Sequence, residues 1–302
     1  MNASVRTRTC WQLRTRSLDL GARTLVMGVV NVTPDSFSDG GSFAETRSAV
    51  AHGVRLLDEG ADLLDLGGES TRPGSSAGGE TPAVSADEEQ ARLLPVLEGI
   101  LQARPGSIVS VDTYKAATAR TAIAAGAEIV NDVSGFTWDP DMPQACGEGR
   151  AGVVLTHTRG RPEEWRTQQQ LAPAAVLAMV RDGLAWSLES AGTAGIRPEA
   201  VVLDPGYGFG KRFGENFSLL AHQGELLGLG RPLLAGISRK SFLGHTLAAL
   251  HGGEPAPVDA RENAGLAAMV AAILHGASVV RVHSVRPAVE AARIADAILA
   301  SG

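Results

Sequence analysis

The sequence is poor in cysteine and has no excess of positive charge. Cys10 and Cys146 are its two cysteines, and their positions show no metal-ligand spacing. A disulfide framework is therefore not expected, and a reducing, cytoplasmic location is the default. The net charge of −6 argues against a general nucleic-acid-binding protein, which would usually be basic. A local cationic pocket is still compatible with this net charge.

Long apolar segments are also scarce. The first residues, MNASVRTRTCWQLRTRS, are polar and contain no apolar core, so we expect no secretory signal. The longest uncharged run covers 263–280, which is long enough to be considered as a membrane span. It contains Asn263, His275 and Gly276, and it divides naturally into a helix and then a strand. We therefore expect a buried helix and strand, and neither a membrane nor a nucleic acid as a partner.

The chain does contain a regular alternation of apolar runs and helical patterns. The apolar runs are 25–30, 61–67, 107–112, 128–132, 152–157, 200–204, 232–238 and 277–283. Their Val, Leu and Ile content with little alternation suits parallel strands buried on both faces. Helical patterns lie at 46–59, 86–103, 115–125, 173–192, 214–228, 258–276 and 287–300, with a weaker one at 140–149.

Eight such repeats in about 300 residues predict an α/β fold, a (β/α)8 TIM barrel in a single domain. We expect this domain to cover 11–302 and expect 1–10 to be disordered. Residues 11–26 precede the first predicted strand, and we expect them to form a short hairpin that closes the bottom of the barrel.

Polar side chains follow almost every predicted strand. They are Asn31, Asp65, Glu69, Asp112, Asn131, Asp132, His157, Asp204, Ser238, Lys240, Arg281 and His283. The carboxyl ends of barrel strands converge on one face, where active sites lie, so we interpret the set as a site. Within it we interpret Asp65 and Asp132 as strand-cap or turn residues, and His157 as a hydrogen-bonded strand-end histidine.

Seven motifs accompany these strand ends. They are NVTPDSFSDGG (31–41), GGESTRPGS (67–75), SVDTYKA (110–116), NDVSG (131–135), DPGYGFGK (204–211), SRKSFLG (238–244) and RVHSV (281–285). In this order, from about residue 11 to residue 300, the chain resembles the dihydropteroate synthase family. DPGYGFGK lacks the spacing of a nucleotide phosphate-binding loop, so we reject that interpretation. The resemblance also implies a (β/α)8 barrel.

The resemblance implies a transferase of folate biosynthesis. Its reaction joins 6-hydroxymethyl-7,8-dihydropterin diphosphate to p-aminobenzoate and gives 7,8-dihydropteroate and diphosphate. The implied pterin pocket consists of Asp112, Asn131, Asp204, Phe209, Lys211 and Lys240. Asp204 would accept two hydrogen bonds from the ring edge, Lys240 would donate to the ring, and the two would face each other across it.

The resemblance places the leaving diphosphate against Asn31, Arg281 and His283. Arg281 and His283 lie two apart on the last strand and so share one face. Asn31 would offer one amide oxygen to Mg²⁺, the implied cofactor, because Mg²⁺ is bound through oxygen ligands and substrate phosphates. We expect an SN1-like route that depends on stabilising the leaving group. The catalytic residues would be Asp112, Asp204, Lys240, Arg281 and His283.

The p-aminobenzoate pocket is assigned by the same resemblance. It would consist of Phe37, Thr71, Arg72, Pro73 and Ser241, with Ser241 at the start of a helix whose amides favour an anion. The family is a sulfonamide target and is usually a homodimer packed through late helices. The segment 264–276 is apolar nearly all round, which fits either a dimer contact or barrel packing.

Two positions depart from the family pattern. Thr156 replaces a methionine that touches the pterin, and Ser284 replaces an aspartate in the last motif. These departures keep open a non-catalytic or re-purposed pterin-binding paralogue. A second alternative is a pterin-dependent methyltransferase on the same barrel, although such an enzyme would not need Arg281 and His283.

Overall fold

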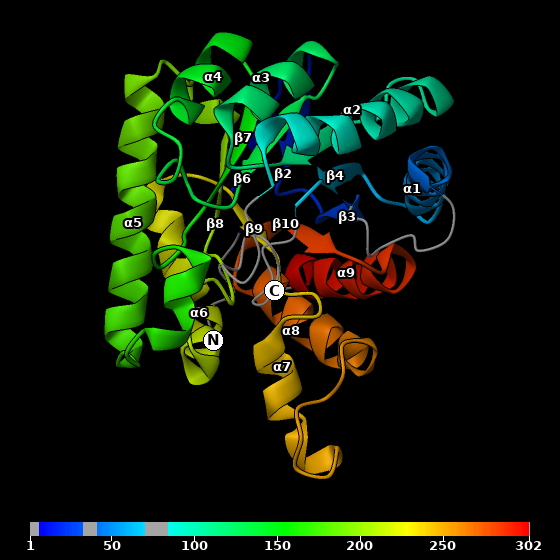
Figure 1. Ribbon diagram of the computed structural model, residues 1–302. Helices are drawn as coiled ribbons and strands as arrows, with labels where there is room; N and C mark the ends of the chain where they lie inside the picture. Colours follow the sequence, from blue (N-terminus) through cyan, green and yellow to red (C-terminus); the bar gives the residue numbers. More distant parts are fainter. Residues whose placement is uncertain (1–5, 33–40, 70–83, 302) are drawn as a thin grey trace.

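Eight parallel strands form a closed barrel at the centre of the molecule (Figure 1). The computed structural model describes residues 6–32, 41–69 and 84–301. The strands are β3 (Leu25–Asn31), β4 (Leu63–Gly67), β5 (Val109–Asp112), β6 (Ile129–Asp132), β7 (Gly152–Thr156), β8 (Val201–Asp204), β9 (Leu233–Ala235) and β10 (Ala277–Val282). Each lies within or close to an expected apolar run, so the predicted barrel is confirmed.

The strands are surrounded by helices (Figure 1). These are α1 (Gly41–Asp58), α2 (Ala86–Ala103), α3 (Ala116–Ala124), α4 (Met142–Gly149), α5 (Pro173–Thr193), α6 (Phe213–His222), α7 (Ser241–Thr246), α8 (Glu262–Leu274) and α9 (Val285–Ala300). The expected helix at 214–228 is α6 followed by a 3₁₀ helix, Gln223–Leu229. The expected helix at 258–276 divides in the same way, with a 3₁₀ helix at Asp259–Arg261 before α8.

One strand boundary differs from the sequence prediction because of a local turn. The run at 232–238 becomes a strand only as far as Ala235. The chain then turns, and the N–H of Lys240 donates to the carbonyl of Ile237 at 3.2 Å. The uncharged run at 263–280 forms most of α8 and then β10, as expected. Across the described ranges, every helix is too short or too polar to cross a bilayer.

An antiparallel hairpin, β1 (Thr9–Gln12) and β2 (Ser17–Leu20), closes the end of the barrel at which the strands begin, called the lower end below. Trp11 packs among the interior side chains of the barrel, and its indole N–H donates to the carbonyl of Ala200 at 3.0 Å. The hairpin begins two residues earlier than predicted. The buried Arg6 side chain ties this end of the chain to the barrel, because it donates to Thr24 Oγ1 at 2.8 Å.

The inside of the barrel consists of an apolar lower layer and a polar upper layer. The lower layer contains Trp11, Leu13, Leu20, Leu25, Met27, Leu63, Ile108, Ile129, Val154, Val202, Leu234 and Val279. Alternate residues of a strand point to the same face, so the residue two positions further along also points inward. Those residues include Asp65, Asn131, Thr156, Asp204 and Arg281. The polar upper layer therefore follows from strand periodicity, and it faces the end opposite the hairpin.

Candidate active site

Arg281 is the centre of a hydrogen-bonded network in the polar layer. Its Nε donates to Asp65 Oδ2 and its Nη2 donates to Asp112 Oδ2, both at 2.6 Å. Asn131 Nδ2 also donates to Asp65 Oδ2, at 2.9 Å. Four strands, β4, β5, β6 and β10, thus contribute one side chain each. The structure brings together three residues that the sequence predicted, Arg281, Asp112 and Asn131, and adds Asp65 to them.

The network contains two buried acceptor atoms that have no hydrogen-bond partner within the described residues. These atoms are Asp65 Oδ1 and Asn131 Oδ1. An unpaired buried acceptor costs about 1–3 kcal/mol, so such atoms in a native protein call for an explanation. Both residues lie in the upper layer, and two inward positions of that layer, Gly67 and Gly236, have no side chain. A flat ligand that carries N–H donors could fill that space and satisfy both acceptors.

Charges in the network are unbalanced, because two carboxylates share one guanidinium. Burial tends to lower the pKa of Arg281, but the Asp65 and Asp112 carboxylates outweigh it and raise that pKa. Arg281 is therefore a permanent cation. Burial also raises the pKa of Asp112 to about 7, with Arg281 opposing the effect and Asp65 adding to it.

The raised pKa of Asp112 predicts a pH dependence of folding. Asp in an unfolded chain titrates near pH 4, roughly three pH units below the folded value. Between pH 4 and 7 the unfolded state has lost a proton that the folded state keeps, so the free energy of unfolding falls as pH rises. Urea unfolding at several pH values should show a shallower fall for Asp112→Asn. Equal slopes in the two proteins would contradict the assignment.

Asp204 ends β8 and begins the second part of the site. The buried carboxylate accepts the N–H of Gly206 on Oδ1 at 2.7 Å. Its other oxygen, Oδ2, lies 3.4 Å from the place where a Cβ on Gly236 would stand, so the missing side chain leaves room beside it. Burial raises the pKa of Asp204, and the Gly206 hydrogen bond and the nearby Lys240 oppose that rise.

Lys240 and Phe209 meet at the same end of the barrel. The Lys240 ammonium lies 3.8 Å from the centroid of the Phe209 ring, in a cation–π contact. Helix α7 begins at Ser241, the residue directly after Lys240, as the family resemblance implied. Among the predicted pterin residues, Lys211 differs because its ammonium contacts backbone carbonyls of Gly206, His157 and Phe209.

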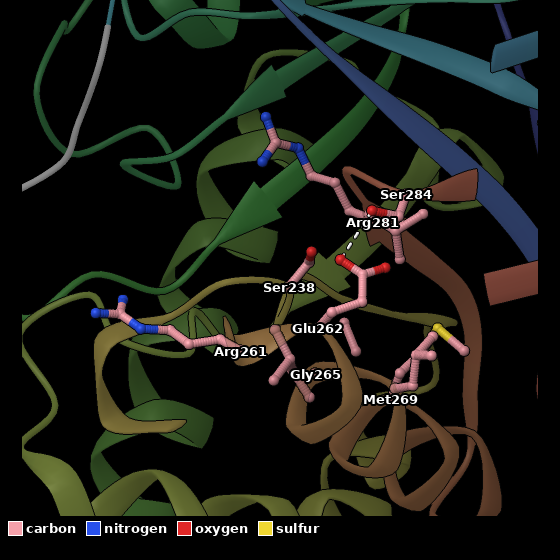
Figure 2. Close-up of a pocket in the computed structure, with 11 residues that line it drawn as sticks. Ser238, Arg261, Glu262, Gly265, Met269, Arg281 and Ser284 are labelled. Atoms are coloured by element: carbon pink, nitrogen blue, oxygen red, sulfur yellow. Dashed lines mark hydrogen bonds between the residues drawn. The ribbon is translucent and has the colours of Figure 1, made fainter. Parts of the chain in front are cut away.

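His283 lies beyond the end of β10, and its Nδ1 lies 3.0 Å from Ser238 Oγ. A small pocket lies beside it, between α8 and the ends of β9 and β10, and Ser238, Glu262 and Ser284 are among the residues that line it (Figure 2). Arg281 extends away from this pocket (Figure 2). Ser284, which also lines this pocket, donates its hydroxyl to Glu262 Oε2 at 2.9 Å (Figure 2). This bond joins the end of β10 to α8. That bond gives the unusual Ser284 a structural role.

Asn31 is the residue for which a metal was expected. It is half-buried at the end of β3, where it pairs in register with Gly67 of β4. In the described part of the chain, no cluster of three His, Cys, Asp or Glu side chains could hold a metal ion. One amide oxygen fits only a Mg²⁺ held mainly by water and by the phosphates of a substrate.

The predicted residues Phe37, Thr71, Arg72 and Pro73 lie outside the described residues. Of the strand-end residues interpreted as structural, Asp132 is confirmed as a turn residue. Its carboxylate accepts the N–H of Ser134 and that of Phe136, each at 2.8 Å, and the Ser134 hydroxyl at 2.7 Å.

His157, interpreted as a hydrogen-bonded strand-end histidine, is buried, and its backbone N–H donates to the Asp204 carbonyl at 2.9 Å. Its ring Nδ1, however, has no hydrogen-bond partner within the described residues. Burial holds the pKa of its imidazole well below the usual range, so the ring is neutral. The interpretation of Asp65 as a strand cap is wrong, because its side chain points into the barrel and contacts Arg281. The apolar residue two positions earlier, Leu63, is the sequence signal that could have revealed this.

A second charged cluster near the barrel mouth was also missed. Lys115, at the start of α3, forms ion pairs with the buried carboxylates of Glu69 and Glu89. Glu89 Oε2 also accepts the hydroxyl of Thr113 at 2.9 Å, and Glu69 Oε1 accepts the N–H of Val84 at 3.1 Å. Burial raises the pKa of Glu89, an effect that Lys115 opposes. The cluster joins the end of β4 to α2 and α3.

Comparison with known proteins agrees with the family resemblance seen in the sequence motifs. A family model described as "Pterin binding enzyme" matches residues 27–283. The chain is similar to the dihydropteroate synthase of Bacillus subtilis, with 40% identity over 95% of this chain and 92% of the relative.

Two solved structures are similar over nearly their whole length. The first is the Xanthomonas albilineans dihydropteroate synthase in complex with 7,8-dihydropteroate, with 38% identity and a TM-score of 0.80 over 96% of this chain and 99% of that one. The second is the Yersinia pestis dihydropteroate synthase with a sulfonamide drug complex, with 37% identity and a TM-score of 0.85 over 97% of this chain and 100% of that one.

Proposed function

We propose that the protein is a dihydropteroate synthase. The basis is that the chain belongs to the pterin-binding enzyme family. It transfers the pterin-methyl group from 6-hydroxymethyl-7,8-dihydropterin diphosphate to the amine of p-aminobenzoate. The products are 7,8-dihydropteroate and diphosphate. The observation that carries the proposal is the pair of unpaired acceptors, Asp65 Oδ1 and Asn131 Oδ1, in a polar layer beside two inward glycine positions.

The pterin ring has a 2-amino group and ring nitrogens along one edge. Asp204 Oδ1 already accepts the Gly206 N–H, and each carboxylate oxygen can accept more than one hydrogen bond, so the Asp204 carboxylate can accept from this edge. Asn131 offers both a donor and an acceptor, which suits the amide-like part of the ring. Lys240 donates to the ring from the side of Phe209. Recognition therefore depends mainly on acceptors held by the barrel strands.

Catalysis depends on the departure of diphosphate. The C–O bond to the pterin methylene breaks, and its electron pair leaves with the diphosphate. The resulting pterin-stabilised methylene cation is attacked by the amine nitrogen of p-aminobenzoate, which then loses a proton to solvent. Arg281 is fixed in position by Asp65 and Asp112, and its remaining N–H groups stabilise the leaving diphosphate. Asn31, at the end of β3, and His283, directly after the neighbouring strand β10, complete the diphosphate site.

A bound Mg²⁺ would neutralise part of the charge of the diphosphate, and Asn31 would supply one oxygen ligand to it. The amide of Asn31 also orients the diphosphate by donating a hydrogen bond. The p-aminobenzoate site consists of Ser241 together with Phe37, Thr71, Arg72 and Pro73.

A turnover assay tests the proposed function. Purified protein is given the pterin diphosphate and Mg²⁺, and diphosphate release is followed with and without p-aminobenzoate. Formation of dihydropteroate in equal amount, inhibited by a sulfonamide and by removal of Mg²⁺, is the expected result. A folded protein that binds the pterin and makes no product would instead be the non-catalytic paralogue that Thr156 and Ser284 kept open.

We further propose that the protein is a homodimer that packs through its late helices. One face of α8 is not covered by the barrel, since Ala267 is exposed and Leu266 and Val270 are half-buried. The nearby Phe213 and Leu250 side chains are 48% and 80% exposed. The molar mass from sedimentation equilibrium should be twice that of the chain, and a monomer at all concentrations would refute the proposal.

A further inference from the structure

Lys211 is a buried lysine whose contacts are all with backbone. Its ammonium donates to the carbonyls of Gly206 at 2.7 Å, His157 at 3.1 Å and Phe209 at 3.3 Å. An ammonium has three protons, and the three carbonyls match them. The side chain is only 5% exposed. Within the described residues, every hydrogen bond of this ammonium is therefore with the backbone.

Burying this charge is costly, and the surrounding carbonyls offset only part of the cost. Burial lowers the pKa of Lys211 to about 7, and the nearby Asp204 carboxylate opposes this fall. A buried cation is tolerated when it is paired or fully hydrogen-bonded. A charged group would not be kept at this position for packing alone, because an apolar side chain of similar length would avoid the desolvation cost.

Gly206 connects Lys211 to the pterin-binding carboxylate. Its carbonyl accepts the Lys211 ammonium, and its N–H donates to Asp204 Oδ1 at 2.7 Å. Its φ angle is +71°, and a Cβ at this position would lie 1.8 Å from the carbonyl oxygen of His157. Only glycine fits, and its two hydrogen-bonding groups therefore have one fixed orientation. Lys211 also holds the carbonyl of Phe209, whose ring lies beneath Lys240.

We propose that Lys211 is a positioning residue of the pterin site, which gathers two carbonyls of the 204–211 turn and that of His157, directly after β7, so that Asp204 and Phe209 keep their orientation. This corrects the expectation that Lys211 contacts the pterin. The proposal rests on the proposed function for the identity of the ligand. The arrangement of Lys211, Gly206 and Asp204 does not depend on it.

The test separates pterin binding from the rest of the reaction. In Lys211→Met, KM for the pterin diphosphate should rise about 10- to 100-fold, in line with one lost hydrogen-bonded charge. KM for p-aminobenzoate should stay within about 2-fold, and kcat at saturating pterin should change far less than KM for the pterin. Lys211→Gln, which keeps two N–H donors, should recover part of the pterin affinity. Lys240→Ala is the contrasting variant, and it should cripple turnover because Lys240 is the predicted ring donor.

Three results would overturn the proposal. They are an unchanged KM for the pterin in folded Lys211→Met, an equal rise in both KM values, and no recovery in Lys211→Gln. Should neither variant fold, a crystal structure of the wild-type protein with the pterin decides. Lys211 Nζ within hydrogen-bond distance of the ring refutes the proposal, whereas Nζ on the same three carbonyls supports it. Failure of wild-type protein to bind the pterin at all would refute the proposed function instead.

Discussion

Asp204→Asn should lower kcat/KM for the pterin diphosphate by about 100- to 1,000-fold, comparable to the loss of one key donor in other active sites. The substitution keeps an oxygen that can accept the Gly206 N–H, so the turn after β8 is preserved. It replaces the other acceptor by an NH₂ group, which would face the 2-amino group of the pterin. One hydrogen bond is lost and a buried donor is left unpaired. Steady-state kinetics with p-aminobenzoate at saturation measure the effect.

Asp132→Asn is the matched control for this variant. Asp132 is also a buried carboxylate at a strand end, but its hydrogen bonds go to Ser134 and Phe136 of its own turn. The control should lose stability and retain KM for the pterin within about 2-fold. If Asp204→Asn retains wild-type kcat/KM, the assignment of Asp204 to the pterin edge is wrong.

Arg281→Met should lower the free energy of unfolding by about 3–5 kcal/mol, the range seen when one partner of a buried ion pair is removed. The Asp65 side chain is fully buried and the Asp112 side chain is 16% exposed, and both would lose their cation. The variant should also lose turnover, because the leaving diphosphate loses its main positive charge. Urea unfolding measures the first effect, and the rate of diphosphate release measures the second.

A second substitution distinguishes charge from packing. Asp65→Asn combined with Arg281→Met removes one of the two charges that would otherwise remain unpaired, so it should recover part of the lost stability without recovering turnover. Arg104→Met is a surface control, since the Arg104–Asp58 pair is exposed and such pairs contribute about 0–1 kcal/mol. Equal losses in Arg281→Met and Arg104→Met would refute a buried network.

Strand periodicity made the barrel and most of its polar layer predictable. Asp112, Asn131 and Arg281 were identified because they are polar residues near the ends of apolar runs and stand in motifs to which the family resemblance assigns substrate contacts, and the structure places them in one network. Asp65 was misassigned because it lies inside a predicted strand, where a carboxylate is normally excluded unless it is paired. Its partner Arg281 is 216 positions away along the chain, so no local pattern could indicate the pairing.

The role of Lys211 was equally hidden from the sequence. Its motif, DPGYGFGK, is rich in glycine and ends in a cation, which suggests a contact with a ligand. The contacts are instead made with three carbonyls, and two of these become close to Lys211 only because Gly206 and Phe209 lie on a tight turn. Backbone conformation with positive φ determines this arrangement. Composition shows that glycine is present, and it does not show which carbonyls will point at the lysine.

The hairpin β1–β2 covers one end of the barrel, so the polar layer can be reached only from the opposite end. Trp11, Leu13 and Leu20 seal the lower opening, so molecules enter and leave past the ends of the strands. A pterin bound at the depth of Asp204 and Asn131 lies between this seal and any ligand nearer the mouth. If the pterin binds there as proposed, we expect the pterin diphosphate to bind before p-aminobenzoate and dihydropteroate to leave with its pterin end last. In that case the hairpin, which takes no part in the chemistry, determines the order in which the two substrates bind.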